Sequence, residues 1–328
     1  MGRFVAGECP ELDRLVADSL VAIGREVSEM RIPLLSGVVL GGGYGRGEGG
    51  AKGEFNVEGS KSPVACRLSN DLDFFAITKD GTTDADAATV AKALEPVSRR
   101  WTEKLGIDVD FTSKTPWRIR HDQERLMVQE LIHGYVDVAG ATGEELFAGI
   151  PRREPSELPW IEAARLLMNR GMGLLLAKSK MESAKCEVDF INRNINKCIL
   201  GAGDARLIAN RRYRWRAPER AEALRDQMYR NAVAWKFRPA ESAVCDWNTA
   251  RDVWRAACEE VMENGACRGA LGRSLREAAR WVVRRRTLGA PASFGQNCTV
   301  RVLRGVARCI EKRLPLPESL RRDWEIFN

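Results

Sequence analysis

Hydrophobic and polar residues follow two different patterns in the two halves of this chain. Before residue 150, short apolar runs such as Val38–Leu40 end in glycine-rich turns, which is typical of buried strands. Beyond Pro159 the apolar residues recur at helical spacing, and no further strand pattern follows. The sequence therefore predicts an α+β domain over residues 1–150 and an all-helical domain over residues 151–328. The proline-rich segment Pro151–Pro159 is the expected boundary.

The same periodicity predicts the individual elements. In the first domain we expect helices at 10–29, 84–104 and 121–133, and strands at 38–40, 70–78, 106–112 and 135–139. In the second domain we expect helices at about 160–178, 184–200, 204–212, 217–235, 243–264, 269–287, 297–313 and 317–327. Pro10 is expected in a first helical turn, the turn Gly81–Asp84 is expected to cap a helix, and residues 51–68 are expected to form an inserted hairpin or loop.

The segment from Ser36 to Thr78 carries the most unusual chemistry. Glycine dominates the stretch after the first apolar run, and glycine lets a backbone approach a ligand closely and present its N–H groups. The next strand carries Asp71 and Asp73, which point to one face because strand side chains alternate. Two adjacent ionised carboxylates repel each other unless a cation lies between them. The segment therefore predicts a phosphate-binding turn beside a magnesium–nucleotide site.

A second acidic strand is predicted within Leu105–Thr112. It carries Asp108 and Asp110, again on one face. Two divalent ions about 4 Å apart are usually bridged by about three carboxylates. Either Asp108 or Asp110 can be the third, and the sequence does not choose between them.

Together these motifs resemble the nucleotidyltransferase superfamily with the polymerase-β fold. The resemblance covers residues 36–112 and depends on the apolar strand, the run Gly42-Gly-Tyr-Gly-Arg-Gly-Glu48, the Asp-x-Asp strand and the later acidic strand. Small bacterial members of this superfamily read Gly-Ser-Tyr-Ala-Arg-Gly-Glu at the turn, so Gly43 stands where a serine is usual. The interval from Gly43 to Asp71 is also longer than in those members.

The resemblance implies a mixed-sheet catalytic head followed by a helical domain. The nucleotide-binding residues that it implies are Gly42, Gly43, Tyr44 and Arg46. The implied catalytic residues, which are also ligands of two Mg²⁺ ions or of Mn²⁺ in their place, are Asp71, Asp73, Asp108 and Asp110. The implied reaction moves a nucleoside monophosphate from a nucleoside triphosphate, such as ATP, to an acceptor hydroxyl and releases pyrophosphate.

The acceptor is expected to be a small hydroxylated molecule, as in the antibiotic-modifying members, rather than a protein side chain or an RNA end. A non-catalytic or antitoxin-like nucleotide-binding module is the alternative, because Gly43 and the insertion depart from the superfamily pattern. Arg46 is expected either to neutralise triphosphate charge or to pair with Glu48. The oligomeric state and the preferred base are not predicted.

Several residues of the helical domain are further candidates. Lys197 lies one helical turn after Arg193 and, by the resemblance, is expected to reach the nucleotide phosphates. The alternative without a ligand role is a solvated helix face that ends at Gly201, with Asp204 capping the next helix. The motif Asn169-Arg170-Gly-Met-Gly173 is expected to form a structural network in which the glycines permit close helix packing.

The charge is uneven along the chain. Residues 1–150 contain 17 Lys and Arg against 24 Asp and Glu, which leaves 35 and 21 of the totals of 52 and 45 for residues 151–328. The acidic half suits cation binding, and the basic half suits the path of an anionic substrate. The arginine-rich stretch 268–322 makes nucleic acid a candidate partner, although a solvated basic face is the commoner case.

The remaining composition narrows the class of protein. Nine cysteines without a Cys-x-x-Cys pair, and only two histidines, predict free thiols and no zinc site. His121 and His133 are expected at the surface or at helix ends rather than in catalysis. No apolar run approaches the ~18 residues of a membrane span, and the first residues lack a signal-peptide core, so a cytoplasmic protein without a membrane partner is expected.

Overall fold

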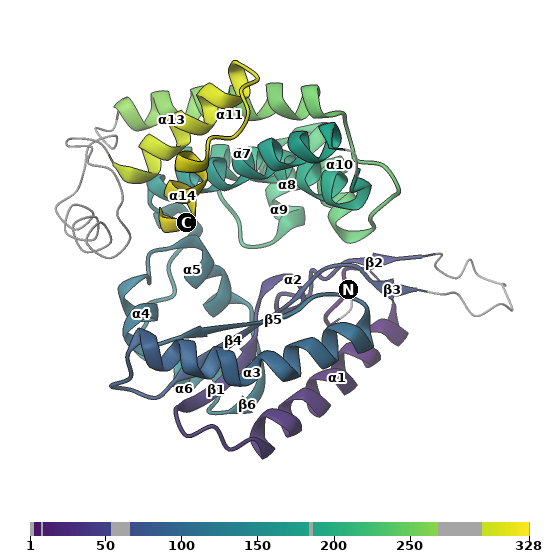
Figure 1. Ribbon diagram of the computed structural model, residues 1–328, viewed down its shortest axis with the longest axis vertical. Helices are drawn as coiled ribbons and strands as arrows, with labels where there is room; N and C mark the ends of the chain where they lie inside the picture. Colours follow the sequence, from purple (N-terminus) through teal and green to yellow (C-terminus); the bar gives the residue numbers. More distant parts are fainter. Residues whose placement is uncertain (1–2, 8, 54–65, 184–185, 268–296, 328) are drawn as a thin grey trace, which may run out of the picture. The chain divides into compact units, whose positions relative to one another are not determined.

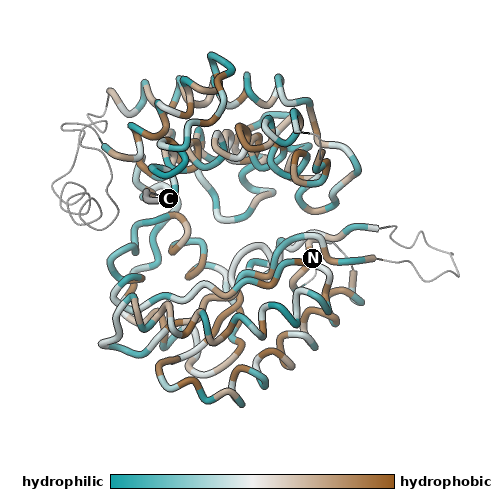
Figure 2. The backbone as a smooth tube through the Cα atoms, viewed as in Figure 1, coloured by the Kyte–Doolittle hydropathy of each residue, from teal (hydrophilic) through white to brown (hydrophobic). Residues whose placement is uncertain are grey.

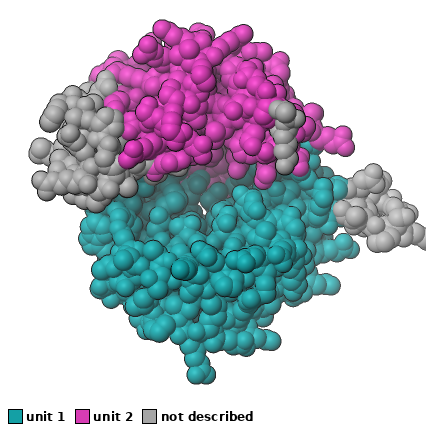
Figure 3. Space-filling model, in the orientation of Figure 1, with its two compact units in different colours: residues 1–153, 236–240 teal, residues 154–235, 241–328 magenta. Residues whose placement is uncertain are grey.

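The computed structural model describes residues 3–7, 9–53, 66–183, 186–267 and 297–327 (Figure 1). The chain divides into two compact units, coloured separately in Figure 3. The first unit comprises residues 1–153 and 236–240, and the helical unit comprises residues 154–235 and 241–328. The division after residue 153 falls inside the proline-rich segment, whereas the return of residues 236–240 to the first unit has no signal in the sequence pattern.

A four-stranded mixed sheet lies in the first unit, so the expected α+β class is confirmed. Its strands are β1 (Leu35–Leu40), β4 (Leu72–Thr78), β5 (Val109–Lys114) and β6 (Val136–Gly140). Their spatial order is β5-β4-β1-β6. β4 and β5 run parallel, and β1 is antiparallel to both of its neighbours. β4 is thus a central strand, with the second acidic strand directly beside it.

Helices cover both faces of this sheet (Figure 1). One face packs against α1 (Pro10–Glu29) and α3 (Asp84–Leu105). The other face packs against α4 (Pro116–His121), α5 (Leu126–His133) and α6 (Gly143–Leu146). Each face therefore has its own apolar core, and a side chain on β4 enters one core or the other according to its position along the strand.

The alternation along β4 decides where its aspartates lie. Phe74 belongs to the core beneath α1 and α3, and Phe75 belongs to the core beneath α4 and α5. Asp73 and Asp71 precede Phe75 in steps of two residues, so they share its face. Both aspartates are half-buried, since they lie at the start of the strand beyond the covering helices.

The ends of α1 and α3 follow from local sequence. Pro10 occupies the first turn of α1, and Thr83 caps α3 in a reciprocal pair of hydrogen bonds with Asp86, as expected. Most apolar residues of α1 form one buried stripe, whereas Leu15 and Val21 are exposed; the apolar positions appear as brown bands along its tube in Figure 2. α3 ends at Gly106, whose φ of 67° is left-handed, so β5 begins at Val109 rather than at residue 106.

Two expectations in the first unit are corrected or confirmed only in part. The hairpin is confirmed at its base, where β2 (Ala51–Lys52) pairs antiparallel with β3 (Arg67–Leu68), while residues 54–65 lie outside the described residues. The single helix expected at 121–133 is wrong. Thr115 caps a separate helix, α4, by accepting a hydrogen bond from the Arg118 N–H, and that helix ends before α5 begins.

In its described residues, the helical unit contains a short 3₁₀ turn and helices. These are η1 (Pro155–Glu157), α7 (Trp160–Glu182), α8 (Val188–Ala209), α9 (Ala217–Leu224), α10 (Gln227–Phe237), α11 (Trp247–Cys267), α13 (Cys298–Glu311) and α14 (Glu318–Phe327). The last residues of α10 belong to the first unit. α7 packs most extensively against α8. The helix expected at 269–287 lies outside the described residues.

The expectation that a helix ends at Gly201 is wrong, because α8 continues through it. A Cβ atom at Gly201 would lie 2.3 Å from the Arg170 Cγ, and one at Gly203 would lie 2.2 Å from the Tyr229 ring. These glycines therefore allow neighbouring side chains to lie directly on the helix backbone. They are packing residues inside one helix, and Asp204 does not cap a new one.

The helix expected at 217–235 is also divided. α9 ends at Arg225, which has a left-handed φ of 59° and donates its N–H to the Ala221 carbonyl. The Asp226 side chain then accepts a hydrogen bond from the Tyr229 N–H and so caps the start of α10. Two cap signals in succession thus override the continuous apolar periodicity.

All nine cysteines are free, as expected. In the part of the chain that the structure describes, every helix is too short or too polar to cross a bilayer.

Candidate functional site

Four aspartates gather where β4 and β5 begin, and we call this group the acidic end of the sheet. Its members are Asp71, Asp73, Asp108 and Asp110. Asp73 and Asp110 are register partners in the parallel pair. The Leu72 N–H donates to the Asp108 carbonyl over 2.9 Å, which brings Asp71 and Asp108 side by side one step earlier. Because paired residues of neighbouring strands point the same way, all four carboxylates share one face.

The like charges at the acidic end have a measurable consequence for Asp110. Its pKa is raised above the ordinary value, first by partial desolvation and then by the charges of Asp108 and Asp71. The nearby Tyr44 is fully buried, and burial raises its pKa to about 12 despite hydrogen bonds from the backbone. Its hydroxyl donates to the Gly50 carbonyl over 2.8 Å. The electrostatic field at this end of the sheet therefore favours a bound cation.

The ligand chemistry suits a hard cation, but the carboxylates are not drawn together into a closed cluster. Among the described residues, no three His, Cys, Asp or Glu side chains converge in a way that could hold a metal ion. Neighbouring strands lie about 4.8 Å apart, so carboxylates at the start of adjacent strands lie near one another. Carboxylate oxygens are ligands that Mg²⁺ prefers, so the donor chemistry of these four side chains suits such an ion.

The glycine turn lies directly against the acidic end. We use this name for residues 41–48, which include the short helix α2 (Gly42–Gly45). The Gly41 N–H donates to the Asp73 carbonyl over 2.8 Å. Gly42 has a left-handed φ of 62°, and a Cβ atom there would lie 2.1 Å from Asp73 Oδ2. Only glycine satisfies both constraints, so the backbone of the turn meets a carboxylate of the Asp-x-Asp strand.

Hydrogen bonds within the turn use several of the amides that the sequence predicted for phosphate binding. The N–H groups of Gly45, Arg46 and Gly47 donate to carbonyls of the turn itself. The N–H groups of Gly42 and Gly43 lie in the first turn of α2, where helix amides have no intrahelical acceptor. The amides that remain for an anion are therefore those at the start of the turn.

Arg46 is held by carboxylates in the structure. Its Nε lies 3.8 Å from Glu48 Oε2, and its Nη1 lies 3.5 Å from Glu130 Oε2 on α5. A Cβ atom at Gly134 would lie 2.3 Å from the Arg46 Cγ, so this glycine makes room for the arginine stem. Of the two roles expected for Arg46, pairing with Glu48 is the one that the structure contains.

A lysine that the sequence did not indicate completes this pairing. Glu48 is fully buried, and Lys236 Nζ lies 2.7 Å from its Oε2. Lys236 belongs to the 236–240 segment of the first unit. Nothing in the local sequence of either residue signals the contact, because the burial of Glu48 and the return of the chain are both tertiary features.

The candidates from the helical unit have other neighbours. Lys197 is exposed on α8, and its expected contact with nucleotide phosphates stays a prediction. Asp204 Oδ1 lies 2.9 Å from Arg220 Nε and accepts a hydrogen bond from the Tyr229 hydroxyl. Since Arg220 is buried and also donates to the Tyr213 hydroxyl, Asp204 has a structural role in this network.

The Asn169–Gly173 motif is structural, as expected. The Trp324 Nε1 donates to Asn169 Oδ1 over 2.8 Å. A Cβ atom at Gly171 would lie 2.7 Å from the Trp254 ring, and one at Gly173 would lie 2.5 Å from Asn194 Oδ1. Both glycines therefore admit side chains of neighbouring helices.

The histidines and the described part of the basic stretch have partners within the protein. His121 stacks on Trp117, and the His133 Nε2 lies 3.0 Å from the Arg153 carbonyl, in line with non-catalytic positions. In the basic stretch, Arg301 pairs with Asp323 over 2.6 Å. Residues 268–296 of that stretch lie outside the described residues, so the nucleic-acid hypothesis stays open.

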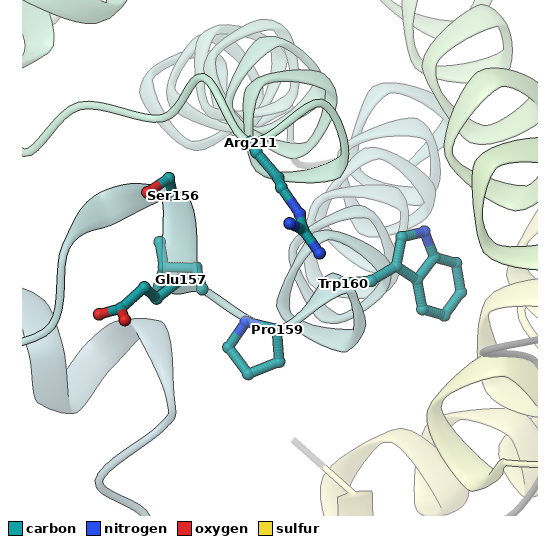
Figure 4. Close-up of a pocket in the computed structure, with 6 residues that line it drawn as sticks. Ser156, Glu157, Pro159, Trp160 and Arg211 are labelled. Carbon is teal, nitrogen blue, oxygen red and sulfur yellow. The ribbon is translucent and has the colours of Figure 1, made fainter. Parts of the chain in front are cut away.

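A pocket of about 520 Å³ opens at the start of α7 in the helical unit (Figure 4). Its lining comprises Ser156, Glu157, Leu158, Pro159, Trp160 and Arg211. The Arg211 side chain extends toward Pro159 and Trp160, while Glu157 Oε2 accepts a hydrogen bond from the Glu154 N–H. Both charged groups are exposed, and the pocket lacks the clustered titratable groups of the acidic end.

Comparisons of this chain with protein-family models, with curated proteins and with solved structures find no match. The case for function is therefore made from the site itself.

Proposed function

We propose that this protein is a magnesium-dependent nucleotidyltransferase that moves a nucleoside monophosphate from a nucleoside triphosphate to an acceptor hydroxyl. The observation that supports the proposal most directly is the register pairing of Asp73 with Asp110, beside a glycine turn that touches Asp73. Four carboxylates offer oxygen ligands to a cation, and the amides of the glycine turn beside them offer N–H donors to an anion. The first-unit architecture is consistent with the polymerase-β fold that the motifs resemble.

The roles follow from the positions of the residues. Asp71 and Asp73 hold the metal, and Asp108 or Asp110 completes the ligand set. The amides of Gly42 and Gly43 bind the phosphates of the substrate. Magnesium, when bound, lowers the pKa of the acceptor hydroxyl and neutralises charge on the leaving pyrophosphate. Asp108 or Asp110 accepts the hydroxyl proton as the acceptor oxygen attacks the α-phosphate and pyrophosphate leaves.

The acceptor we propose is a small hydroxylated molecule. This choice follows the antibiotic-modifying members of the superfamily that the motifs resemble. Retention of the protein on RNA that weakens steeply with salt would instead favour an RNA end.

The test is release of pyrophosphate from the four common nucleoside triphosphates, with a panel of small hydroxylated acceptors, in Mg²⁺ or in chelator. We expect metal-dependent release that falls at least about 100-fold in Asp73→Asn. The matched control is Asp80→Asn. Asp80 lies just beyond the other end of β4, largely exposed and paired with Arg120, so its replacement should leave turnover unchanged.

The result that contradicts the proposal is absence of turnover with every triphosphate and acceptor by the correctly folded chain. Triphosphate binding without turnover would instead identify a regulatory nucleotide-binding module, which is the second function that the site can serve.

A further inference from the structure

The buried carboxylate of the glycine turn depends on a residue from a remote part of the chain. Lys236 Nζ and Glu48 Oε2 lie 2.7 Å apart, and 188 positions separate the two residues in the sequence. The Glu48 side chain is only 1% exposed and that of Lys236 is 19% exposed. An ionised carboxylate that is buried is strongly destabilised unless a cation faces it. Lys236 therefore offsets the charge of the buried Glu48 carboxylate.

The pair continues into a row of alternating charges. Lys236 and Arg46 both face Glu48 Oε2, and Arg46 also faces Glu130 on α5. The row thus runs from the 236–240 segment through the glycine turn to a helix that covers the sheet. Arg46 lies farther from Glu48, at 3.8 Å, than Lys236 does, at 2.7 Å. The lysine is therefore the closer of the two cations that fix the Glu48 side chain.

The backbone of Glu48 closes the turn that binds phosphate in our proposal. Its N–H donates to the Gly43 carbonyl over 2.8 Å, and its own carbonyl would lie 3.3 Å from a Cβ atom at Gly43. The carbonyl of Lys236 packs more closely on Gly50, since a Cβ atom at Gly50 would lie 2.6 Å from it. The 236–240 segment therefore contacts the glycine turn through the Lys236 side chain. It also contacts Gly50, just after the turn, through the Lys236 carbonyl.

We propose that Lys236 is a positioning residue for the glycine turn. By holding Glu48, it fixes the peptide that closes on Gly43 and thereby the direction of the Gly42 and Gly43 amides. The nature of the bound anion, a nucleoside triphosphate, rests on the proposed function. The ordering of the turn by Lys236 does not.

The test compares Lys236→Met with Lys236→Arg, with the double variant Glu48→Gln/Lys236→Met, and with the control Lys180→Met in the full-length chain. Lys180 forms an ion pair of similar length, 2.6 Å, with Glu187, but both side chains are about two-fifths exposed. The first readout is amide hydrogen exchange of peptides that cover residues 41–49 without any ligand. The second is KM for the triphosphate and kcat for pyrophosphate release.

We expect Lys236→Met to speed exchange in residues 41–49 about tenfold while exchange in the other strands of the sheet is unchanged. KM should rise about tenfold with kcat within a factor of about two, since a supporting residue orients the binding groups without touching the reacting atoms. Lys236→Arg should restore both values, and Lys180→Met should alter neither.

The proposal would be overturned if amide hydrogen exchange in residues 41–49 were as slow in Lys236→Met as in the unmodified protein, whatever the activity of the variant. If the unmodified protein neither binds nor turns over any triphosphate, the proposed function fails and the exchange measurement still decides the positioning role. If Lys236→Met does not fold, the double variant decides, because it removes the buried unpaired charge. It should fold with a fast-exchanging turn, and a slow-exchanging turn there would overturn the proposal.

Discussion

Asp204 of the helical unit and Asp110 of the first unit lie in opposite electrostatic surroundings. In the helical unit, Asp204 faces the buried Arg220 and the Tyr229 hydroxyl. At the acidic end of the sheet, Asp110 faces Asp108 and Asp71, and these like charges help to raise its pKa. The first arrangement sets a carboxylate against a buried cation, whereas the second sets carboxylates beside one another. The contrast teaches that a carboxylate with a buried cationic partner maintains the fold, and that carboxylates gathered together are candidates for ligand binding.

The largest expected effect is a difference in the free energy of unfolding between variants of Asp204 and of Asp110. Asp204→Asn leaves the buried Arg220 guanidinium without its opposing charge, so the free energy of unfolding should fall by about 3 kcal/mol. Asp110→Asn removes one of several like charges, so the free energy of unfolding should stay the same or rise. Urea unfolding followed by circular dichroism measures both variants. Equal losses in the two would show that the contrast is wrong.

A smaller effect is expected from glycine replacement in the turn. Gly42→Ala places a Cβ atom against Asp73 Oδ2 in a left-handed conformation, which should cost about 1–2 kcal/mol of stability. Gly43→Ser is the matched change. Its Cβ atom meets only the Glu48 carbonyl at 3.3 Å, and its φ is not left-handed, so the cost should stay below about 0.5 kcal/mol.

The same two variants should differ in ligand binding. Gly42→Ala should weaken binding of magnesium and triphosphate because it displaces the Asp73 carboxylate. Gly43→Ser supplies the hydroxyl found at this position in the superfamily that the chain resembles, so it should strengthen triphosphate binding. Calorimetric titration with a non-hydrolysable triphosphate measures this. Similar losses in both variants would argue against a phosphate-binding role of the turn.

The smallest expected effect is a pH dependence of stability that comes from Asp110. Its pKa in the folded chain is above the unfolded value of 3.8, so the folded state binds the proton more tightly. The destabilisation by this group is therefore present above the folded pKa and disappears as the pH falls through that value toward 3.8. Because Asp110 is exposed, the effect should be only about 0.5 kcal/mol.

This dependence is best measured as a difference. The unfolding free energy of Asp110→Asn should exceed that of the unmodified protein at pH 7, and the difference should vanish near pH 4. Millimolar Mg²⁺ at pH 7 should also reduce the difference, since a cation offsets the same repulsion. A difference that grows as the pH falls would contradict the assigned cause.

The features that the sequence predicted well are those that depend on neighbouring residues. The cap at Thr83 and the first turn at Pro10 are local signals, and both are found. The shared face of Asp71 and Asp73, and that of Asp108 and Asp110, was expected from strand alternation alone, whereas the register that pairs Asp73 with Asp110 was not predicted. The sequence could not show that Gly42 has a left-handed φ and lies against Asp73, because several glycines of the turn could have taken that position.

The features that it predicted poorly depend on what packs against them. Gly201 has the appearance of a helix end, but Arg170 lies against it and the helix continues. A lone glycine carries no information on whether another side chain fills the space that it leaves. Likewise, the pairing of Glu48 with Lys236 joins positions too far apart for any periodic signal to connect them.

The return of residues 236–240 to the first unit has a consequence for the gene as well as for the protein. An open reading frame cut at codon 153 would encode every aspartate of the acidic end, yet would omit Lys236, which lies nearer to Glu48 than Arg46 does. A second half exchanged from a related gene would have to bring a 236–240 segment that still fits the glycine turn of the first half. The two halves of this chain are therefore expected to be inherited together.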